Sequence, residues 1–290
     1  MPKTLTVFTP TYNRAYILPK LYESLKEQTS QDFCWLVVDD GSTDNTEELI
    51  NAYKAENLVD ITYLKQPNGG KQRAHNTGVK NAQTELFVCV DSDDHLVADA
   101  VESLISKWQE VKANNVVGIV GYRGKNQNET LSGEFTIHGQ CTLQKLYSSG
   151  FKGDTTLMYK TEVLKANLFP EIEGEKFITE NYVYYQIDKI GELEVFEKIL
   201  VIAEYLEDGY TKSKYKLHAK NPLGYIMYYN MLIGDTKSLA KKFKYSVALA
   251  DVMFLGKVKG KFKKAKNKFM LFWAMPLGYL VYLKRRKDAK

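Results

Sequence analysis

Short apolar runs alternate with amphipathic stretches along the first hundred residues. Four runs have the apolar density of buried strands, and strands are predicted at 5–10, 33–39, 59–64 and 85–91. Helices are predicted at 16–28, from Asp44 onward, at 72–82 and at 98–113. Asp44-x-x-Glu47 resembles a capping box at the start of the second helix. The alternation predicts an α/β fold, in which a mainly parallel sheet carries helices on both faces.

From about residue 116 the pattern is less regular. Strands are predicted at 116–123, 133–137, 155–160 and 193–206, and helices at 140–149 and 178–190. The strict alternation of strand and helix is lost here. We therefore expect a mixed region to follow the parallel part of the sheet.

The composition is that of a globular protein. Hydrophobic residues make up 44 % and charged residues 26 % of the 290 residues, which leaves ample apolar surface for a core. The three cysteines are too few and too scattered for a disulfide framework or a zinc site, and they fit a reducing compartment. A proline and a polar cluster interrupt the N-terminal segment, where a signal peptide needs an apolar core, so we do not expect secretion.

The net charge of +5 hides a division along the chain. Residues 1–236 hold 24 Lys and Arg against 33 Asp and Glu, whereas residues 237–290 hold 16 against 2. An acidic body with a strongly basic tail indicates that the tail has an anionic partner, either a membrane or a nucleic acid.

Polar segments follow the four predicted strands of the first half, at 10–14, 39–42, 66–71 and 91–94. Ligands of parallel sheets bind beyond the carboxyl ends of the strands, so we expect the functional residues in these segments. Asp-Ser-Asp-Asp at 91–94 can hold a divalent cation through oxygen ligands, although the same residues suit a turn that caps the next helix. Asn-Gly-Gly-Lys at 68–71, near a helix start, would suit a diphosphate.

Four motifs occur in a defined order, and together they are more specific than any one of them. They are TPTYNR, VVDDGSTDNT, NGGKQRAHNTG and VDSDD. In this combination the chain resembles the family 2 glycosyltransferases, strongly over residues 4 to about 110, weakly across 116–210 and not in the tail. The resemblance implies the GT-A fold, a Rossmann-like nucleotide-sugar-binding sheet, a UDP-sugar donor and Mn²⁺ or Mg²⁺ as cofactor.

The resemblance also implies roles for individual residues. The donor-binding positions are Pro10, Thr11, Tyr12, Arg14, Asp40, Gly70, Lys71, Arg73, Asp91, Ser92 and Asp93. Asp91 and Asp93 match the family's Asp-x-Asp, in which the second acid usually binds the metal and the first lies nearer the ribose or a metal-bound water. The metal and the basic groups would stabilise the charge that develops on the leaving diphosphate.

An inverting transfer also needs a general base for the acceptor hydroxyl. The family often uses an acid of a Glu-Asp pair that opens a helix, and here Glu180 is followed by Asn181, which leaves Glu180 as the expected base. Asp154 is the fallback. The segment 205–213 is a candidate loop that closes over the donor, and His218 is either a late metal ligand or a surface histidine.

A continuous apolar stretch at 269–283 lies between two basic clusters. As a helix it would span about 22 Å, short of the roughly 30 Å hydrocarbon core of a bilayer. We expect it to anchor the chain peripherally, as a monotopic segment, on an anionic membrane surface. The residues expected at the membrane are Lys263, Lys264, Phe269, Phe272, Trp273, Lys284, Arg285 and Arg286. The alternatives are a helix packed on the body of the protein, and a nucleic-acid partner, for which an apolar insert is unsuited.

These expectations combine into three segments and one reaction. Residues 1–115 would be the nucleotide-sugar-binding half of a GT-A domain, 116–236 the acceptor-binding half, and 237–290 the helical, basic tail. We expect an inverting, metal-dependent hexosyltransferase of bacterial polysaccharide biosynthesis, with an undecaprenyl-diphosphate-linked glycan as acceptor, at the cytoplasmic face of the cell membrane. No nucleic acid is expected as a partner, and assembly into a homo-oligomer is left open.

Three other functions compete with this one. A membrane scaffold subunit with the same fold, inactive or dependent on a partner, is the main alternative, and the presence of Asp91, Asp93 and Glu180 counts against it. A nucleotidyltransferase would need a glycine-rich segment after the first strand, and a nicotinamide oxidoreductase would need G-x-G-x-x-G there. This chain has Thr-Pro-Thr-Tyr-Asn at that place instead.

Overall fold

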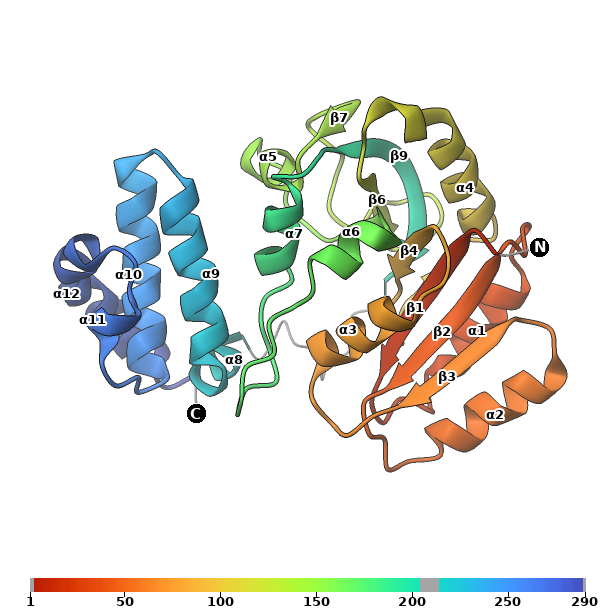
Figure 1. Ribbon diagram of the computed structural model, residues 1–290, viewed down its shortest axis with the longest axis horizontal. Coiled ribbons are helices and arrows are strands. Elements are labelled where there is room, and N and C mark those ends of the chain that lie inside the picture. The colour runs from red at the N-terminus through yellow and green to blue at the C-terminus, as the bar shows by residue number, and fades with distance from the viewer. Residues whose placement is uncertain (1–2, 204–213, 289–290) are drawn as a thin grey trace. The chain divides into compact units, whose positions relative to one another are not determined.

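The computed structural model describes residues 3–203 and 214–288 of the chain (Figure 1). The chain forms two compact units. The first contains Met1–Leu168 and Val183–Tyr205, and the second contains Phe169–Tyr182 and Leu206–Lys290. The candidate donor-closing loop at 205–213 lies outside the described residues.

A nine-stranded sheet forms the centre of the first unit, in the order β3-β2-β1-β4-β8-β6-β9-β5, with β7 paired to β9. The strands are β1 (Leu5–Thr11), β2 (Phe33–Asp39), β3 (Ile61–Lys65), β4 (Leu86–Cys89), β5 (His95–Leu96), β6 (Gly118–Gly124), β7 (Gln140–Cys141), β8 (Thr155–Lys160) and β9 (Leu193–Ile202). The first four neighbours in this order are parallel, whereas β8 is antiparallel to both β4 and β6. The predicted change from a parallel to a mixed sheet is confirmed.

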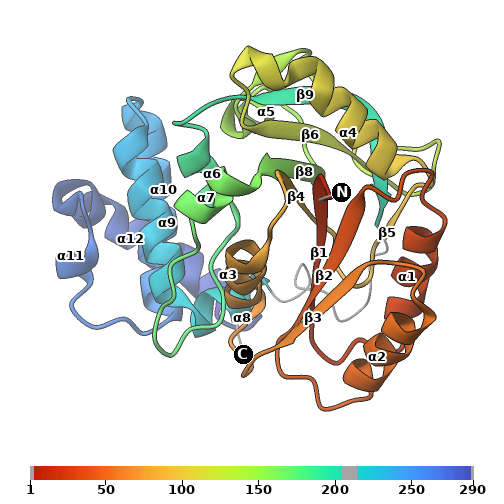
Figure 2. The ribbon, with the colours of Figure 1, turned by 45° about the vertical axis from the view of Figure 1, so that its right-hand side comes forward.

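Helices cover both faces of the sheet, as the sequence predicts. Those of this unit are α1 (Leu18–Lys26), α2 (Thr46–Glu56), α3 (Lys71–Asn81), α4 (Ala100–Val111), the 3-10 helix η1 (Lys112–Asn114), α5 (Leu143–Ser148), α6 (Thr161–Ala166) and most of α7 (Asn181–Ile187). In Figure 2, α3 lies on one side of β1, β2 and β3, and α1 and α2 lie on the other side.

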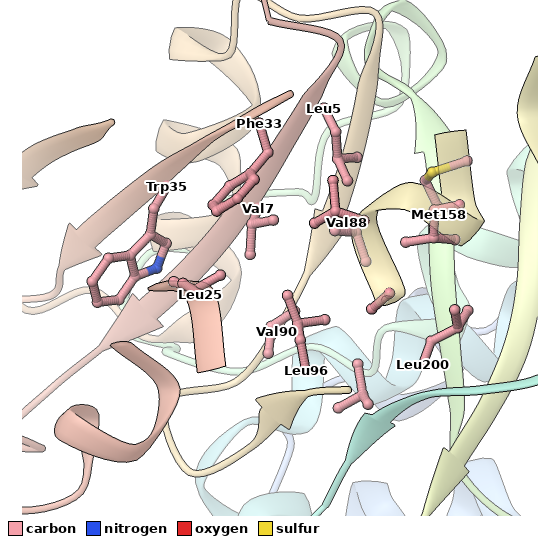
Figure 3. Packing of buried hydrophobic residues seen from close by; sticks show 14 of the residues in the cluster. Leu5, Val7, Leu25, Phe33, Trp35, Val88, Val90, Leu96, Met158 and Leu200 are labelled. Carbon is pink, nitrogen blue, oxygen red and sulfur yellow. The ribbon is translucent and has the colours of Figure 1, made fainter. Parts of the chain in front are cut away.

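Both faces of the central strands are buried, which explains their continuous apolar sequences. Leu5 and Val7 of β1 belong to one buried cluster with Phe33 and Trp35 of the neighbouring strand and Leu25 of α1 (Figure 3). Phe8 points to the opposite face and packs against α3, where a Cβ atom on Gly78 would lie 2.3 Å from the Phe8 ring. The core of this unit therefore lies on both sides of the sheet.

Two local predictions are wrong. The segment 133–137 is not a strand, because it is held by side chains: the Phe135 amide donates to the Tyr122 hydroxyl at 2.7 Å, and the two rings stack. The capping box is also wrong, because α2 begins two residues after Asp44, and Asn45 is its N-cap. The Asp44 carboxylate instead accepts hydrogen bonds from the backbone amides of Thr46 and Ala15.

The second unit is helical. Its helices are α8 (Lys214–Lys220), α9 (Pro222–Asp235), α10 (Leu239–Leu255), α11 (Lys261–Lys264) and α12 (Lys268–Arg285). Apolar side chains of α9, α10 and α12 form one cluster, which includes Ile226, Leu249 and Leu271. Close packing of α12 on α10 depends on Gly278, since a Cβ atom there would lie 2.4 Å from the Ala250 Cβ. Among the described residues, no helix is long and apolar enough to cross a membrane.

Candidate active site

The carboxyl ends of several strands meet at one edge of the sheet. Thr11 ends β1 opposite Asp39, which ends β2, and Cys89 at the end of β4 pairs with Phe8 of β1. Strand β6 runs in the same direction as β4 because both are antiparallel to β8. Arg123, near the end of β6, is thereby brought to the same edge.

Hydrogen bonds link the segment that follows β1 to the segment that follows β2. The Asn13 amide donates to the Ser42 hydroxyl at 2.8 Å, and the Asn13 side-chain oxygen accepts from the Thr43 amide at 2.8 Å. Asn13 has a left-handed backbone conformation with φ of 53°. Asp39 accepts the Ser42 amide at 2.7 Å and the Tyr63 hydroxyl at 2.6 Å. These bonds hold two of the predicted functional segments in one arrangement.

Asp40 holds the glycine turn that precedes α3. Its carboxylate accepts the amides of Gly69 at 2.9 Å and Gly70 at 2.7 Å, and the side-chain amide of Gln66 at 2.7 Å. Gly70 has a φ of 94° and is the N-cap of α3. Asp40 is buried, and its hydrogen bonds hold the turn that leads into Lys71.

Lys71 and Asp91 form an ion pair at the centre of this edge, with 2.8 Å between the Lys71 Nζ and the Asp91 carboxylate. Burial acts to raise the pKa of Asp91, but the positive charges of Lys71 and Arg123 outweigh it and hold the pKa below its usual value. Asp93 differs, because burial and the neighbouring Asp91 charge raise its pKa, against the weaker effect of Arg14. Two carboxylates of one motif therefore have opposite electrostatic surroundings.

Arg123 joins this cluster of charged side chains, although no sequence motif points to it. Its guanidinium lies 2.7 Å from the Asp94 carboxylate and 3.9 Å from that of Asp91, and its Nε donates to the Thr155 carbonyl at 3.3 Å. Burial raises the pKa of Asp94 to about 7, and the Arg123 charge opposes that rise. Arg123 ends the apolar run at 116–123, so the rule of strand ends would have identified it if the direction of that strand had been known.

The other predicted donor-binding residues lie along the same edge. The Tyr12 ring is 48 % exposed, whereas Thr11 is buried and its hydroxyl has no hydrogen-bond partner among the described residues. Arg73 packs on Gly69, where a Cβ atom would lie 2.7 Å from the Arg73 Cδ. Pro10 and Ser92 are buried.

The two candidate bases lie in different units. Asp154 is exposed and directly precedes β8, next to Thr155, whose carbonyl accepts from Arg123. Glu180 directly precedes α7 and is partly exposed, in the segment Phe169–Tyr182 of the second unit. His218, also in the second unit, is buried, and its ring packs edge-on against Tyr225 with 4.1 Å between centroids.

Most of the residues expected at the membrane are exposed. They are Lys263, Lys264, Phe269, Phe272, Trp273, Lys284 and Arg286. Arg285 is the exception, because its Nη1 lies 2.7 Å from the carboxylate of Asp251, which is buried in α10. This ion pair links the end of α12 to α10.

The acidic edge fits a divalent cation only in part. Among the described residues, no group of three or more His, Cys, Asp and Glu side chains could hold a metal ion. Mg²⁺ is commonly bound by one or two carboxylates, with phosphate oxygens of the substrate and water completing its shell. Asp91 and Asp93 fit that arrangement, because they are two part-buried carboxylates of one motif. Burial and the Asp91 charge raise the pKa of Asp93, and a bound cation would offset the repulsion between the two carboxylates.

The fold of the chain is that of sugar-nucleotide-dependent glycosyltransferases of the GT-A type. The crystal structure of residues 1–349 of Staphylococcus aureus TarS, in complex with UDP-GlcNAc, superimposes with a TM-score of 0.64. The match covers 98 % of this chain and 91 % of that one, at 18 % sequence identity. At this identity the likeness concerns the fold alone.

The sequence assigns the family. Residues 6–168, more than half of the chain, match Glycosyl transferase family 2, and the chain belongs to that family. Glycosyltransferase GlyA of Streptococcus pneumoniae is 31 % identical over 190 residues, which cover 65 % of this chain and 26 % of GlyA. A Campylobacter jejuni protein named GalNAc(5)-diNAcBac-PP-undecaprenol beta-1,3-glucosyltransferase is 24 % identical over 86 % of this chain and 80 % of its own length. The chain spans about a quarter to two fifths of several curated relatives that it matches.

Proposed function

We propose that the chain is an inverting, metal-dependent glycosyltransferase that moves a sugar from a UDP-sugar to a hydroxyl of an undecaprenyl-diphosphate-linked glycan. The observation that carries the proposal is the cluster at the strand ends, where Lys71 and Arg123 meet the carboxylates of Asp91 and Asp94. Asp93 lies in the same motif. This combination suits a nucleoside diphosphate with a divalent cation.

Donor binding would use the edge of the first unit. The exposed ring of Tyr12 offers a face on which a base can stack, and Asp40 holds the glycine turn at the start of α3. UDP is the expected nucleotide, because the solved TarS structure of the same fold is a complex with UDP-GlcNAc.

Asp91 and Asp93 are the residues that would hold Mn²⁺ or Mg²⁺. Such an ion would supply charge neutralisation for the diphosphate leaving group. Lys71 lies within 3.0 Å of Asp91, and its ammonium would stabilise the same negative charge while keeping the carboxylate ionised. Arg123 would orient Asp94 and Asp91 by its contacts with both.

Glu180 is the proposed general base, which takes the proton of the acceptor hydroxyl as that oxygen attacks the anomeric carbon. Its support is its position in the sequence at the start of α7. Asp154 remains the fallback, supported by its position beside the contact of Thr155 with Arg123. The name of the Campylobacter jejuni relative supports a lipid-linked glycan as acceptor.

Residues 1–115 would bind the donor, with Arg123 contributed by the segment that follows. Residues 116–236 would bind the acceptor, and residues 237–290 would make a peripheral contact with the cytoplasmic face of the cell membrane. The basic charge of the last segment supports that location. Bacterial polysaccharide synthesis is the proposed setting.

Calorimetric binding of UDP and of GDP to the full chain tests the proposal, with Mn²⁺ and with EDTA. Binding of UDP that is lost in EDTA is the expected result, because the diphosphate and the two carboxylates would share one cation. Binding of neither nucleotide to folded protein would contradict the donor assignment and would favour the scaffold function instead.

A further inference from the structure

One face of α12 is apolar and exposed to solvent. Its side chains recur at helical spacing, and the largest exposed fractions are those of Phe269 at 71 %, Phe272 at 60 % and Trp273 at 59 %. Leu277, Tyr279 and Leu280 are 46 %, 45 % and 54 % exposed. A contiguous patch of large apolar side chains on a protein surface marks an interaction site.

The opposite face of α12 packs against the second unit. The exposed face therefore contributes nothing to the core of that unit. Leu271, Ala274 and Gly278 are buried and lie against α10. Asp251 of α10 binds Arg285 at the end of α12. The buried face therefore fixes α12 against α10, and the aromatic side chains on the other face are exposed to solvent.

Positive charge surrounds the exposed face. Exposed lysines and arginines precede and follow it, at Lys263, Lys264, Lys266, Lys268, Lys284 and Arg286. Residues 237–290 contain 16 basic against 2 acidic residues. Aromatic side chains flanked by basic ones complement the acyl–headgroup boundary and the phosphates of an anionic leaflet.

We propose that the exposed face of α12, with the basic residues at its two ends, docks the second unit on the surface of an anionic lipid bilayer. The aromatic and leucine side chains enter the boundary between headgroups and acyl chains. The lysine and arginine side chains bind the lipid phosphates.

The same unit carries the proposed base, and this consequence rests on the proposed function. The Glu175 carboxylate accepts the amides of Leu223 at 2.7 Å and Gly224 at 2.8 Å at the start of α9, and the Lys176 amide donates to the Asn221 side chain at 2.9 Å. These bonds fasten Phe169–Tyr182, and with it Glu180, to the helices that include α12. Docking of α12 would therefore hold the acceptor side of the enzyme at the bilayer that contains a lipid-linked acceptor.

Co-sedimentation of the full chain with vesicles tests the proposal. One set contains equal parts of phosphatidylglycerol and phosphatidylcholine, and the other contains phosphatidylcholine alone. We expect strong binding to the anionic set only, and a loss of about tenfold or more in Phe272→Ser/Trp273→Ser. The matched control is Leu58→Ser/Ile190→Ser, which removes two side chains of similar exposure, 58 % and 55 %, from the first unit and should bind as the wild type does.

Charge is tested separately with Lys263→Gln/Lys264→Gln/Lys268→Gln, for which we expect about a tenfold loss. Lys54→Gln/Lys80→Gln/Lys112→Gln, with three exposed lysines of the first unit, is its control and should bind normally. Equal binding by both triple variants would contradict the role of the tail.

Trp273 also reports insertion directly. Trp35 and Trp108 are fully buried, so brominated lipids should quench only the fluorescence of Trp273, and Trp273→Phe should remove that quenching.

Absence of quenching and of vesicle binding overturns the proposal. Self-association that Phe272→Ser/Trp273→Ser abolishes, without vesicle binding, would show that a second copy covers the face. UDP binding measured on the same samples separates this failure from a failure of the donor assignment.

Discussion

At the scale of single residues, the two acids of the Asp-x-Asp motif have different neighbours. Asp91 is paired with Lys71 at 2.8 Å, and its pKa is lowered, whereas burial and the charge of Asp91 raise the pKa of Asp93. Asp91 already has a cationic partner in Lys71, whereas the negative charge of Asp93 is opposed by that of Asp91, and an added cation would offset this repulsion. This supports Asp93 as the more direct metal ligand.

Asp93→Ala should weaken UDP binding in the presence of Mn²⁺ by at least about tenfold, because the metal bridge to the diphosphate would be lost. Calorimetry with Mn²⁺ and with EDTA measures the change. Asp60→Ala, at an exposed acid before β3, is the control and should bind UDP normally. Wild-type affinity in Asp93→Ala would remove Asp93 from the site.

Glu180→Gln should leave UDP binding intact and lower the transfer rate by about 10²–10⁴-fold, because glutamine cannot accept the acceptor proton. Sugar transfer under single-turnover conditions measures it. Asp154→Asn is the matched comparison, since it makes the same isosteric change at the other candidate. Loss of turnover in Asp154→Asn, with normal turnover in Glu180→Gln, would transfer the role of base to Asp154.

At the scale of elements, the sequence predicts long buried strands better than local connections. The apolar run 33–39 coincides with β2, and the run 155–160 coincides with β8. Strands β5 and β7 have two residues each, which is too short for a repeating pattern of apolar and polar residues. Both are defined by their antiparallel pairing with β9. Apolar and polar residues alternate in the segment 133–137 as they do in a strand, but the segment does not pair with the sheet, and its Phe135 ring stacks on the ring of Tyr122.

The close approach of α3 to the sheet depends on Gly78, and Gly78→Ala should therefore destabilise the protein. A Cβ atom at this position would lie 2.3 Å from the ring of Phe8, which is fully buried and stacked with Phe87. Overpacking of this kind costs about 1–3 kcal/mol. The free energy of unfolding, measured with urea, should fall by that order.

Gly234→Ala is the matched control for this change. Apart from its chain neighbours and the backbone of its own helix, no atom of the described residues lies within 4 Å of a Cβ placed at Gly234, which is in α9. Alanine is favoured over glycine inside helices by about 1 kcal/mol, so this variant should be equal to or more stable than the wild type. Equal stability of the two variants would contradict the close approach of α3 to β1.

At the scale of the whole molecule, the residues proposed to bind the donor and those proposed to face the membrane belong to different compact units. Tail deletion is a poor test of membrane binding, because Leu271, Ala274 and Gly278 of α12 form part of the core of the second unit. Point substitutions on the exposed face of α12 keep that core intact. They also allow the two activities to be measured one at a time.

Donor binding and vesicle binding should respond independently to substitution. Phe272→Ser/Trp273→Ser should bind UDP within about twofold of the wild-type affinity, and Asp93→Ala should bind anionic vesicles normally, because the two sets of side chains belong to different compact units and share no partner. Calorimetry and co-sedimentation on the same two proteins measure both properties. A tenfold loss of UDP affinity in the α12 variant would show that the two units are coupled.

The sequence by itself determines the family, the parallel half of the sheet and the strand-end segments of the candidate site, because these depend on local periodicity and on short motifs. Only the tertiary structure decides which residues of those segments contact one another. It brings Arg123 to Asp94, makes Asp40 the support of a glycine turn, and gives α12 one buried and one exposed apolar face. The physical reason is that strand order, strand direction and the choice between two apolar faces arise from contacts between residues far apart in the chain, which periodicity does not encode.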